Sequence, residues 1–230
     1  MRYERAAIVG AGSGLSASLA RLFAHEGMHV SLAARDTGKL SELARETGAR
    51  VYACDAVKPD EVNRLFESLD KDAGAPDVVV YNASARARGP FVELNPADVE
   101  RALLTGAFGG FLVAQAAVKR MLPNRHGAVL LTGASASVKG YPQSAPFAMG
   151  KFALRGMAQS MARELAPMGI HVAHFVIDGG IRNPGRTEPA DKPDSLLDPD
   201  AIAANYLHVL KQPRSVWTWE IEFRPWTERF

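Results

Sequence analysis

The sequence is poor in the features that mark secreted and nucleic-acid-binding proteins. Its 230 residues include one cysteine, Cys54, so no disulfide can form within the chain and a reducing compartment fits best. The 27 Lys and Arg residues nearly balance the 25 Asp and Glu residues. The basic residues stand in scattered pairs such as Arg86 with Arg88, which is typical of a solvated surface rather than of a nucleic-acid-binding patch. We therefore expect a cytoplasmic protein that binds no nucleic acid.

Long hydrophobic runs and clusters of metal ligands are also lacking. The longest apolar run, around residues 107–118, is broken by Gln115 and is too short to span a bilayer. The chain does not open with the charged segment, apolar segment and cleavage site of a secretory leader. The histidines form no ligand cluster, since His171 and His174 lie three apart in a predicted strand and point to opposite faces. We expect neither a membrane segment nor a metal site.

What the sequence does contain is a regular alternation of short apolar runs with amphipathic segments. Near-continuous apolar strands that alternate with helices are typical of a parallel sheet covered on both faces. The predicted fold class is therefore α/β, a doubly wound, Rossmann-type parallel sheet of about seven strands in one domain, residues 1–230. The predicted strands are 6–9, 29–34, 50–54, 77–82, 128–132, 171–177 and an edge strand within 217–224, and the predicted helices begin near 15, 37, 59, 96, 144 and 200.

A glycine-rich turn follows the first predicted strand. Gly10-Ala11-Gly12-Ser13-Gly14 leads into a helix that begins at Leu15. Glycines let the backbone approach a pyrophosphate, and unpaired N–H groups at the start of a helix point at its negative charge. The spacing is Gly-x-Gly-x-Gly, so Leu15 stands where the dinucleotide fingerprint has its third glycine.

The end of the second predicted strand bears on the choice of cofactor. Arg35 stands there, with Asp36 after it. The fingerprint has an acidic residue near this point to hold a ribose 2′-OH, whereas an arginine suits a 2′-phosphate. Arg35 therefore favours NADP(H) over NAD(H), and a plain surface role for this arginine is the alternative.

Ligands in doubly wound folds bind outside the carboxyl ends of the strands. These ends are Gly10, Arg35, Asp55, Asn82 and the loop after Thr132. The segment 181–198 follows a further strand end, is rich in Pro, Asp and Gly, and shows no periodicity. We interpret it as a lid or loop over a small-molecule substrate, and a disordered linker is the alternative.

These motifs, in this order and spacing, resemble the classical short-chain dehydrogenase/reductase family over nearly the whole chain. The glycine turn looks like the family's glycine motif, with Ser16 in place of its last glycine. Cys54-Asp55-Ala56 looks like the stretch that contacts adenine, Tyr81-Asn82-Ala83-Ser84 looks like the Asn-Asn-Ala-Gly element, and Asp178-Gly179-Gly180 lies where the family has Pro-Gly. The resemblance implies a dinucleotide site formed by Gly10, Gly12, Ser13, Gly14, Leu15, Arg35, Asp55, Ala56, Asn82, Ala83, Lys151, Asp178, Gly179 and Ile181.

The family's chemistry depends on Asn, Ser, Tyr and Lys side chains, and the resemblance maps these four onto Gly106, Ala134, Phe147 and Lys151. Only the lysine matches, so we expect three of the four groups to be missing. In the family the tyrosine transfers the substrate proton, and phenylalanine has no proton to give. The candidate catalytic residues are therefore Lys151, Ser135 and Tyr141, with Ser144 and Asp178 as further proton donors. The alternatives are an apolar wall of the substrate pocket for Tyr141 and a capping role for Asp178.

Two functions remain open from the sequence. The first is an NAD(P)(H)-dependent oxidoreductase that acts on a small carbonyl or alcohol substrate by an altered proton route, since the hydride comes from the cofactor. The second is a catalytically impaired dinucleotide-binding protein with a sensing or partner-binding role. In the family, the helix that here contains Gly106, Gly109 and Gly110 forms a subunit interface with the helix of Lys151. The resemblance therefore implies a homo-oligomer, a dimer or tetramer.

Overall fold

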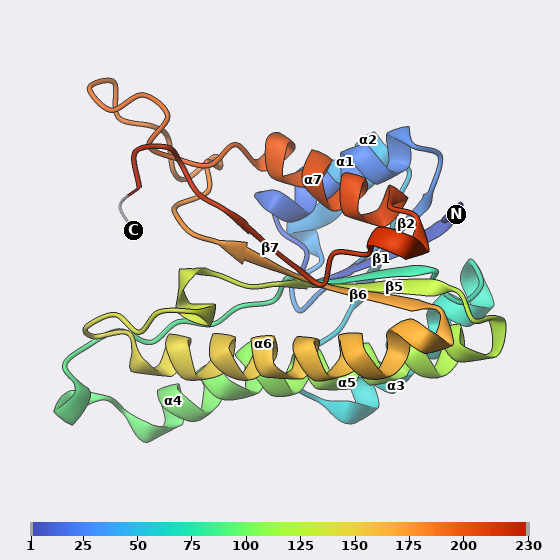
Figure 1. Cartoon of the computed structure of the whole chain (residues 1–230), viewed down its shortest axis with the longest axis horizontal. Coiled ribbons are helices and arrows are strands. Elements are labelled where there is room, and N and C mark those ends of the chain that lie inside the picture. The colour runs from blue at the N-terminus through green and yellow to red at the C-terminus, as the bar shows by residue number, and fades with distance from the viewer. Residues whose placement is uncertain (1, 229–230) are drawn as a thin grey trace.

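Seven parallel strands form one sheet in the structure, a computed structural model that describes residues 2–228. The strand order is β3-β2-β1-β4-β5-β6-β7, so the chain winds outward from β1 in both directions, as the doubly wound class requires (Figure 1). This confirms the predicted fold class. The strands are β1 (Arg5–Val9), β2 (His29–Ala34), β3 (Arg50–Ala53), β4 (Val78–Tyr81), β5 (Gly127–Thr132), β6 (Ile170–Ile177) and β7 (Glu220–Phe223).

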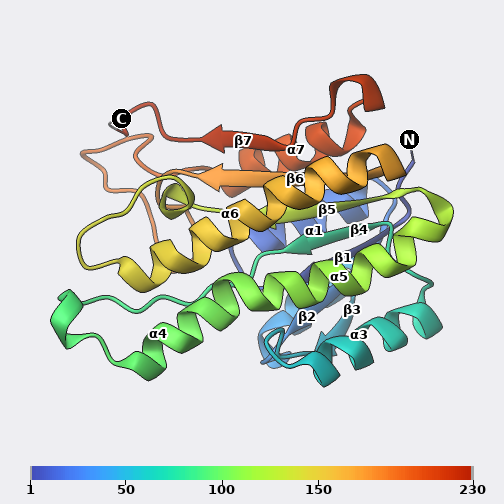
Figure 2. The ribbon, with the colours of Figure 1, turned by 60° about the horizontal axis from the view of Figure 1, so that its bottom comes forward.

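Helices cover both faces of the sheet, which explains why its central strands are apolar without alternation (Figures 1 and 2). Ile8, Val80 and Leu130 point to the face covered by α1 (Leu15–His25), α2 (Ser41–Thr47) and α7 (Pro199–Lys211). Val79 and Leu131 point to the opposite face. That face is covered by α3 (Pro59–Asp72), α4 (Pro96–Leu103), α5 (Gly109–Met121) and α6 (Ala145–Leu165).

The helix predicted to begin near 96 is interrupted by a π-helical turn, Leu104–Phe108, between α4 and α5. A Cβ on Gly106 in this turn would lie 3.0 Å from the Cα of Gly150, so the turn crosses α6 at a point where neither helix carries a side chain. The carbonyl of Thr105, in the same turn, accepts a hydrogen bond of 2.6 Å from the Tyr81 hydroxyl. The small residues of these two helices therefore serve a close crossing within the chain.

The helical run Pro96–Asn124 is 29 residues long and, by length and composition, apolar enough to cross a membrane. The apolar run 107–118 is too short to indicate such a length. The helical run is longer because it also includes apolar residues on both sides of 107–118. Half of its most apolar window is buried inside the protein, where α5 packs on α3 and the sheet. Core helices of globular proteins share this length and composition.

The last strand, β7, lies at the edge of the sheet beside β6, as predicted. It is shorter than the predicted segment 217–224, and ahead of it Trp217 stacks on His171, with 4.6 Å between ring centroids. The segment after β6 contains no helix before α7 and forms two isolated bridges, Ile181 with Leu197 and Asn183 with Arg186. This segment projects beyond the end of β6, at the upper left of Figure 1.

Candidate functional site

The glycine turn between β1 and α1 is held against the end of β4. Gly10 has a φ of +85°, and a Cβ at this position would come within 2.5 Å of the Cα of Ala83. Only glycine fits both the backbone conformation and the space. The N–H groups of Gly10 and Ala11 both donate to the Ala33 carbonyl at the end of β2. The turn is therefore fixed by the two strands that flank β1.

Ser16, in the first turn of α1, fixes the glycine turn from inside. Its hydroxyl donates to the Gly10 carbonyl at 3.3 Å and accepts a 2.7 Å hydrogen bond from the side-chain amide of Asn82. Asn82 also donates its backbone N–H to the Val9 carbonyl. No local pattern predicts this hydrogen bond, because Ser16 and Asn82 lie 66 residues apart.

The ends of β1 to β4 meet at a cavity of about 340 Å³. Its wall brings together six of the fourteen predicted dinucleotide-binding residues, namely Gly10, Arg35, Asp55, Ala56, Asn82 and Ala83. Lys39, which was not predicted, also lines it and pairs with Asp36 at 3.2 Å. Cys54 lies in the wall as well, and burial raises the pKa of its thiol to about 11, so that it stays protonated near neutral pH.

The remaining residues of the turn face a neighbouring cavity of about 390 Å³. Gly12 and Ser13 line it, together with Arg182 and Asn183 from the segment after β6. A Cβ on Gly14 would lie 3.7 Å from the Asn183 side chain, so this segment reaches the turn. Leu15 is buried in the core, which leaves only its backbone for a ligand.

A third cavity, of about 530 Å³, lies between the segment after β4, the loop after β5, the start of α6 and the segment after β6. Ser135, Tyr141 and Ser144, three of the proposed proton donors, line it together with Phe147 and Ala134. Gly179 also lines it, while Ile181 follows in the bridge to Leu197. Arg86 and Arg88 are exposed, as expected of solvated surface, and both also line this cavity.

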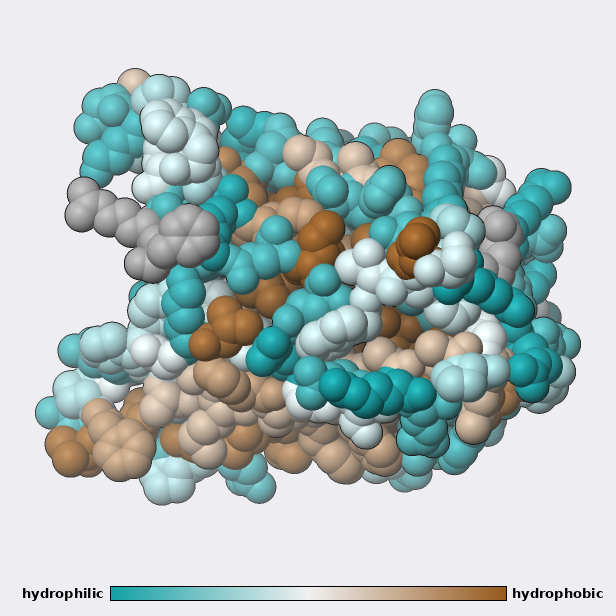
Figure 3. Space-filling view, in the orientation of Figure 1, coloured by the Kyte–Doolittle hydropathy of each residue, from teal (hydrophilic) through white to brown (hydrophobic). Residues whose placement is uncertain are grey.

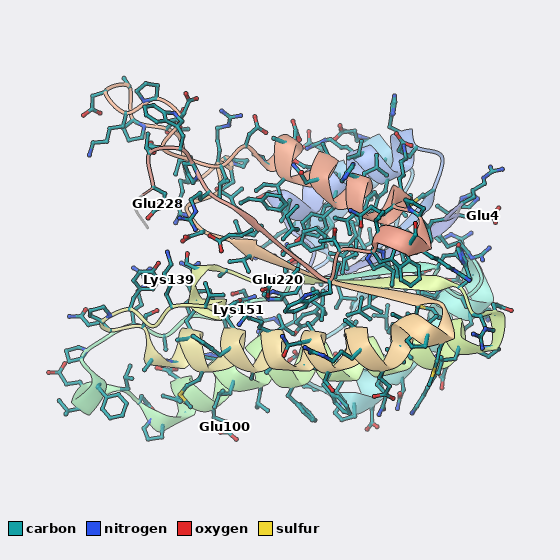
Figure 4. The ribbon with its side chains drawn as sticks, in the orientation of Figure 1. Glu4, Glu100, Lys139, Lys151, Glu220 and Glu228 are labelled. Carbon is teal, nitrogen blue, oxygen red and sulfur yellow. The ribbon has the colours of Figure 1, made fainter. Side chains whose placement is uncertain are left out.

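Lys151 lies behind this cavity rather than in its wall. Its side chain is buried between α6 and the sheet (Figure 4), and its Nζ donates a 2.7 Å hydrogen bond to the Thr132 carbonyl. The Nζ lies 5.9 Å from the centroid of the Phe147 ring. Burial, with a smaller contribution from the charge of Arg86, lowers the pKa of Lys151 to about 8. The pKa of this lysine is thus closer to neutral pH than that of an exposed lysine, and its ammonium group lies behind the Phe147 ring.

Asp178 is an ionised anchor of the loops around this cavity. Its carboxylate is 1% exposed and lies 2.9 Å from Lys139 Nζ and 3.5 Å from Arg224. Burial acts to raise the pKa of this carboxyl, but hydrogen bonds from Ser135 and Lys139 and the two cations outweigh it and hold the pKa below its usual value. The arrangement favours a fixed counter-charge over the proton-donor role considered for Asp178.

A buried polar chain beneath the loop after β5 was missed in the sequence. Ser137 Oγ lies 3.3 Å from His174 Nε2, and His174 Nδ1 lies 3.0 Å from the carboxylate of Glu220 on β7. Arg155 on α6 holds that carboxylate through two hydrogen bonds of 2.7 Å. Burial lowers the pKa of His174 to about 4, so its imidazole is neutral. Ser137 Oγ also accepts a hydrogen bond from the Ala134 N–H. These linked hydrogen bonds therefore hold the backbone of the loop after β5.

The described residues contain no group of three His, Cys, Asp or Glu side chains arranged to hold a metal ion. His171 and His174 do lie on opposite faces of β6, as predicted from their spacing. His171 stacks on Trp217, whereas His174 joins the chain to Ser137 and Glu220.

Comparison with known proteins agrees with this geometry. A family model described as short chain dehydrogenase matches residues 4–190. The chain is 27% identical over 226 residues to an uncharacterized oxidoreductase of Staphylococcus aureus (strain N315), covering 96% of each. Among solved structures it is similar to a short-chain dehydrogenase from Rhodopseudomonas palustris, with a TM-score of 0.84 and 34% identity over 98% of this chain and 100% of that chain.

The fold also matches an alcohol dehydrogenase from the archaeon Thermococcus sibiricus complexed with 5-hydroxy-NADP, with a TM-score of 0.87 and 24% identity over 99% of each chain. At that identity the likeness shows the fold alone. The family model covers most of the chain. The chain belongs to the short-chain dehydrogenase family and is an NAD(P)-dependent oxidoreductase of that family.

Proposed function

We propose that the protein is an NADP(H)-dependent oxidoreductase that reduces a small carbonyl compound, or oxidises the corresponding alcohol, without the family's tyrosine. The observation that carries the proposal is the convergence of the glycine turn, Arg35, Asp55 and Asn82 on one cavity, next to a second cavity lined by hydroxyl groups. The bound dinucleotide would supply the hydride, and the chain would supply binding, orientation and the proton.

The preference for NADP(H) rests on the charges near the end of β2. Arg35 lines the cavity and forms no ion pair with another residue in the described range 2–228. Lys39 adds a second cation, although Asp36 neutralises it in part. A guanidinium that has no partner and faces a nucleotide cavity suits a 2′-phosphate. The Thermococcus sibiricus protein of the same fold was solved with an NADP derivative, which agrees with this proposal.

The proton route is the unusual part of the proposal. The positions of the family's Asn, Ser and Tyr carry Gly106, Ala134 and Phe147, none of which can transfer a proton. The cavity instead offers the hydroxyl groups of Ser135 and Tyr141, with Lys151, whose pKa is lowered to about 8, behind the Phe147 ring. Tyr141 is 44% exposed, whereas the Ser135 hydroxyl is engaged by Asp178. We propose that one of these hydroxyls contacts the reacting oxygen and that Lys151 sets the charge beside it.

The experiment is a screen of carbonyl substrates for NADPH oxidation with the wild-type protein and the variants Lys151→Ala, Ser135→Ala and Tyr141→Phe. A positioned acid or base contributes about 10²–10⁴ in rate, so loss of the true donor lowers kcat by at least about 100-fold. Rates unchanged in all three variants would remove these residues from the mechanism.

A catalytically impaired protein that binds a dinucleotide and acts by sensing or through a partner is the second candidate. One observation favours it, namely the burial of Lys151, which lines neither the nucleotide cavity nor the substrate-side cavity. Tight NADPH binding without turnover over a wide panel of aldehydes and ketones would support this second candidate against the first.

We further propose a homo-oligomer, a dimer or tetramer, that forms through the α4–α6 side of the molecule. Figure 3 shows apolar residues gathered along this side. Phe108, Phe111, Met149 and Phe152 are each at least 40% exposed on these helices, and exposed apolar patches of this kind mark interaction surfaces. Light scattering after size-exclusion chromatography tests the proposal, and a monomer at micromolar concentration would overturn it.

A further inference from the structure

The cavity on the substrate side carries three arginines and no acidic side chain among the residues that line it. Arg86 and Arg88 come from the segment after β4, and Arg186 comes from the segment after β6. The other lining residues are uncharged: Ala134, Ser135, Ala136, Tyr141, Pro142, Gln143, Ser144, Phe147, Ile177, Gly179 and Gly180. Three cations thus surround a space of about 530 Å³.

The first two arginines are directed into the cavity by the local backbone. The segment after β4 is irregular, and it is tied to the loop after β5 by a hydrogen bond from the Gly89 N–H to the Gln143 carbonyl. Arg86 and Arg88 are two residues apart, and both side chains line the same cavity. The guanidinium carbon of Arg86 lies 4.3 Å from the centroid of the Phe147 ring, so the ring acts as a platform for the charge.

Arg186 reaches the cavity from a different segment of the chain, the one after β6, through a tight turn. The N–H of Asn183 donates to the Arg186 carbonyl, and the N–H of Arg186 donates back to the Asn183 carbonyl. The Asn183 side chain caps the turn by accepting the Gly185 N–H at 2.9 Å. A Cβ on Gly180 would lie 3.2 Å from Arg186 Nη1, so the guanidinium rests on backbone that carries no side chain.

The three charges are not neutralised by the part of the chain that the structure describes. Arg86, Arg88 and Arg186 form no ion pair with residues 2–228, while the neighbouring Asp178 is taken by Lys139 and Arg224. The pKa of Arg86 is lowered, first by burial and then by the charges of Arg88 and Arg186. The three guanidinium groups are therefore close enough to disfavour one another, a cost that a bound anion would remove.

We infer that the substrate carries an anionic group, a carboxylate or a phosphate ester, in addition to the reacting carbonyl or hydroxyl, and that Arg86, Arg88 and Arg186 bind this group. Guanidinium groups match carboxylate and phosphate oxygens through paired hydrogen bonds. The inference rests on the proposed function, since it names the substrate class of that site. A role of these arginines toward the cofactor itself is disfavoured, because the nucleotide cavity and the substrate-side cavity share no lining residue.

The test compares probes that differ only in charge, titrated by calorimetry into the protein saturated with NADP⁺. One pair is 4-oxopentanoate and its methyl ester, and the other is dihydroxyacetone phosphate and dihydroxyacetone. Charge-assisted hydrogen bonds are stronger than neutral ones, so we expect at least one anion to bind at least about tenfold more tightly than its neutral partner. The pair that shows the difference identifies carboxylate or phosphate as the recognised group.

The same titrations use Arg86→Gln and Arg186→Gln, with Arg45→Gln as a control because Arg45 lies on α2, away from the cavity. We expect each cavity variant to weaken binding of the anion about tenfold and to leave binding of the neutral probe and of NADPH unchanged. Equal binding of charged and neutral probes, anion binding that is insensitive to both variants, or no anion binding at all would overturn the inference. So would a loss of NADPH affinity in the variants, since the arginines would then serve the cofactor.

These outcomes separate the inference from the proposed function. Arginine-dependent anion binding without NADPH oxidation by any anionic carbonyl compound would keep the recognition site and count against the oxidoreductase activity. NADPH oxidation by neutral carbonyl compounds without any preference for an anion would keep the activity and remove the inference.

Discussion

The guanidinium of Arg86 lies on the ring of Phe147, with 4.3 Å between the guanidinium carbon and the ring centroid. Lys151 Nζ lies 5.9 Å from the same centroid. The ring therefore lies next to both the cationic substrate-side cavity and the buried ammonium. A phenol at this position would find one cation beside it in the cavity and a second behind it, and both favour its ionised form.

Restoring that phenol is the most direct test of the altered proton route. In Phe147→Tyr we expect NADPH oxidation to rise at least about tenfold, because a positioned acid contributes about 10²–10⁴ in rate. Steady-state assays at saturating NADPH measure the rate of NADPH oxidation. The control is Phe147→Leu, which removes the ring without adding a hydroxyl and is expected to give no gain. A rate in Phe147→Tyr that does not exceed the wild-type rate would mean that another group already transfers the proton efficiently.

Arg35 is expected to set the preference between the two dinucleotides. Arg35→Gln removes a cation from the wall of the nucleotide cavity, so the affinity for NADPH falls at least about tenfold, as for the loss of a charge-assisted hydrogen bond. The affinity for NADH, which has no 2′-phosphate, stays unchanged. Quenching of intrinsic fluorescence on titration with each dinucleotide gives both constants, with Arg45→Gln as the matched surface control. An equal loss for NADPH and NADH would contradict the proposed contact.

Two glycines of the same turn differ in the space that they leave for a side chain. Gly10→Ala combines a φ of +85° with an overlap against Ala83, and strain of this kind costs about 1–3 kcal/mol. We expect its free energy of unfolding to fall by about that amount, with loss of NADPH binding. Gly12→Ala has nothing within 4 Å of the added Cβ, so its unfolding in urea should match the wild type. An unchanged urea midpoint for Gly10→Ala would refute the described backbone contact.

The lowered pKa of Lys151 predicts that the free energy of unfolding depends on pH. Burial lowers its pKa from 10.5 to about 8, so between these values the unfolded chain binds more protons than the folded one and stability rises with pH. Below about pH 8 the folded state carries the buried ammonium charge, and its free energy of unfolding is lowered by the full amount. The wild type should therefore gain about 2–3 kcal/mol from pH 8 to 10.5 relative to Lys151→Met, which lacks the titrating group. Urea unfolding of both proteins at several pH values measures this difference, and parallel pH profiles would exclude the lowered pKa.

Much of the fold followed from local pattern. The apolar runs at 6–9, 77–82 and 128–132 predict strands that are buried on both faces, and such strands need helices on either side. The turn at Gly10 and the strand ends Arg35, Asp55 and Asn82 were also readable, because parallel strands bring their carboxyl ends to one edge of the sheet. The nucleotide cavity of the structure contains all four.

What the sequence could not provide were the contacts between distant segments. The sequence indicates only an ordinary surface pair for Arg86 and Arg88. Arg186 is about 100 residues away in the sequence, and only the fold brings it to the same cavity. The chain from Ser137 through His174 to Glu220 joins three elements that no local periodicity connects. The role of Ser16 likewise depends on Asn82, 66 residues away.

The π-helical turn at Leu104–Phe108 has a consequence for how the chain tolerates change. A π turn holds one more residue than an α turn, so the faces of α4 and α5 are offset by about 100° from those of a continuous helix. Removing a single residue from this turn would bring the two helices into one regular phase. The deletion would rotate Gly106 away from Gly150 and withdraw the Thr105 carbonyl from Tyr81. We therefore expect a one-residue deletion here to destabilise the protein more than most substitutions do. The deletion changes the direction of every side chain on one half of the helix.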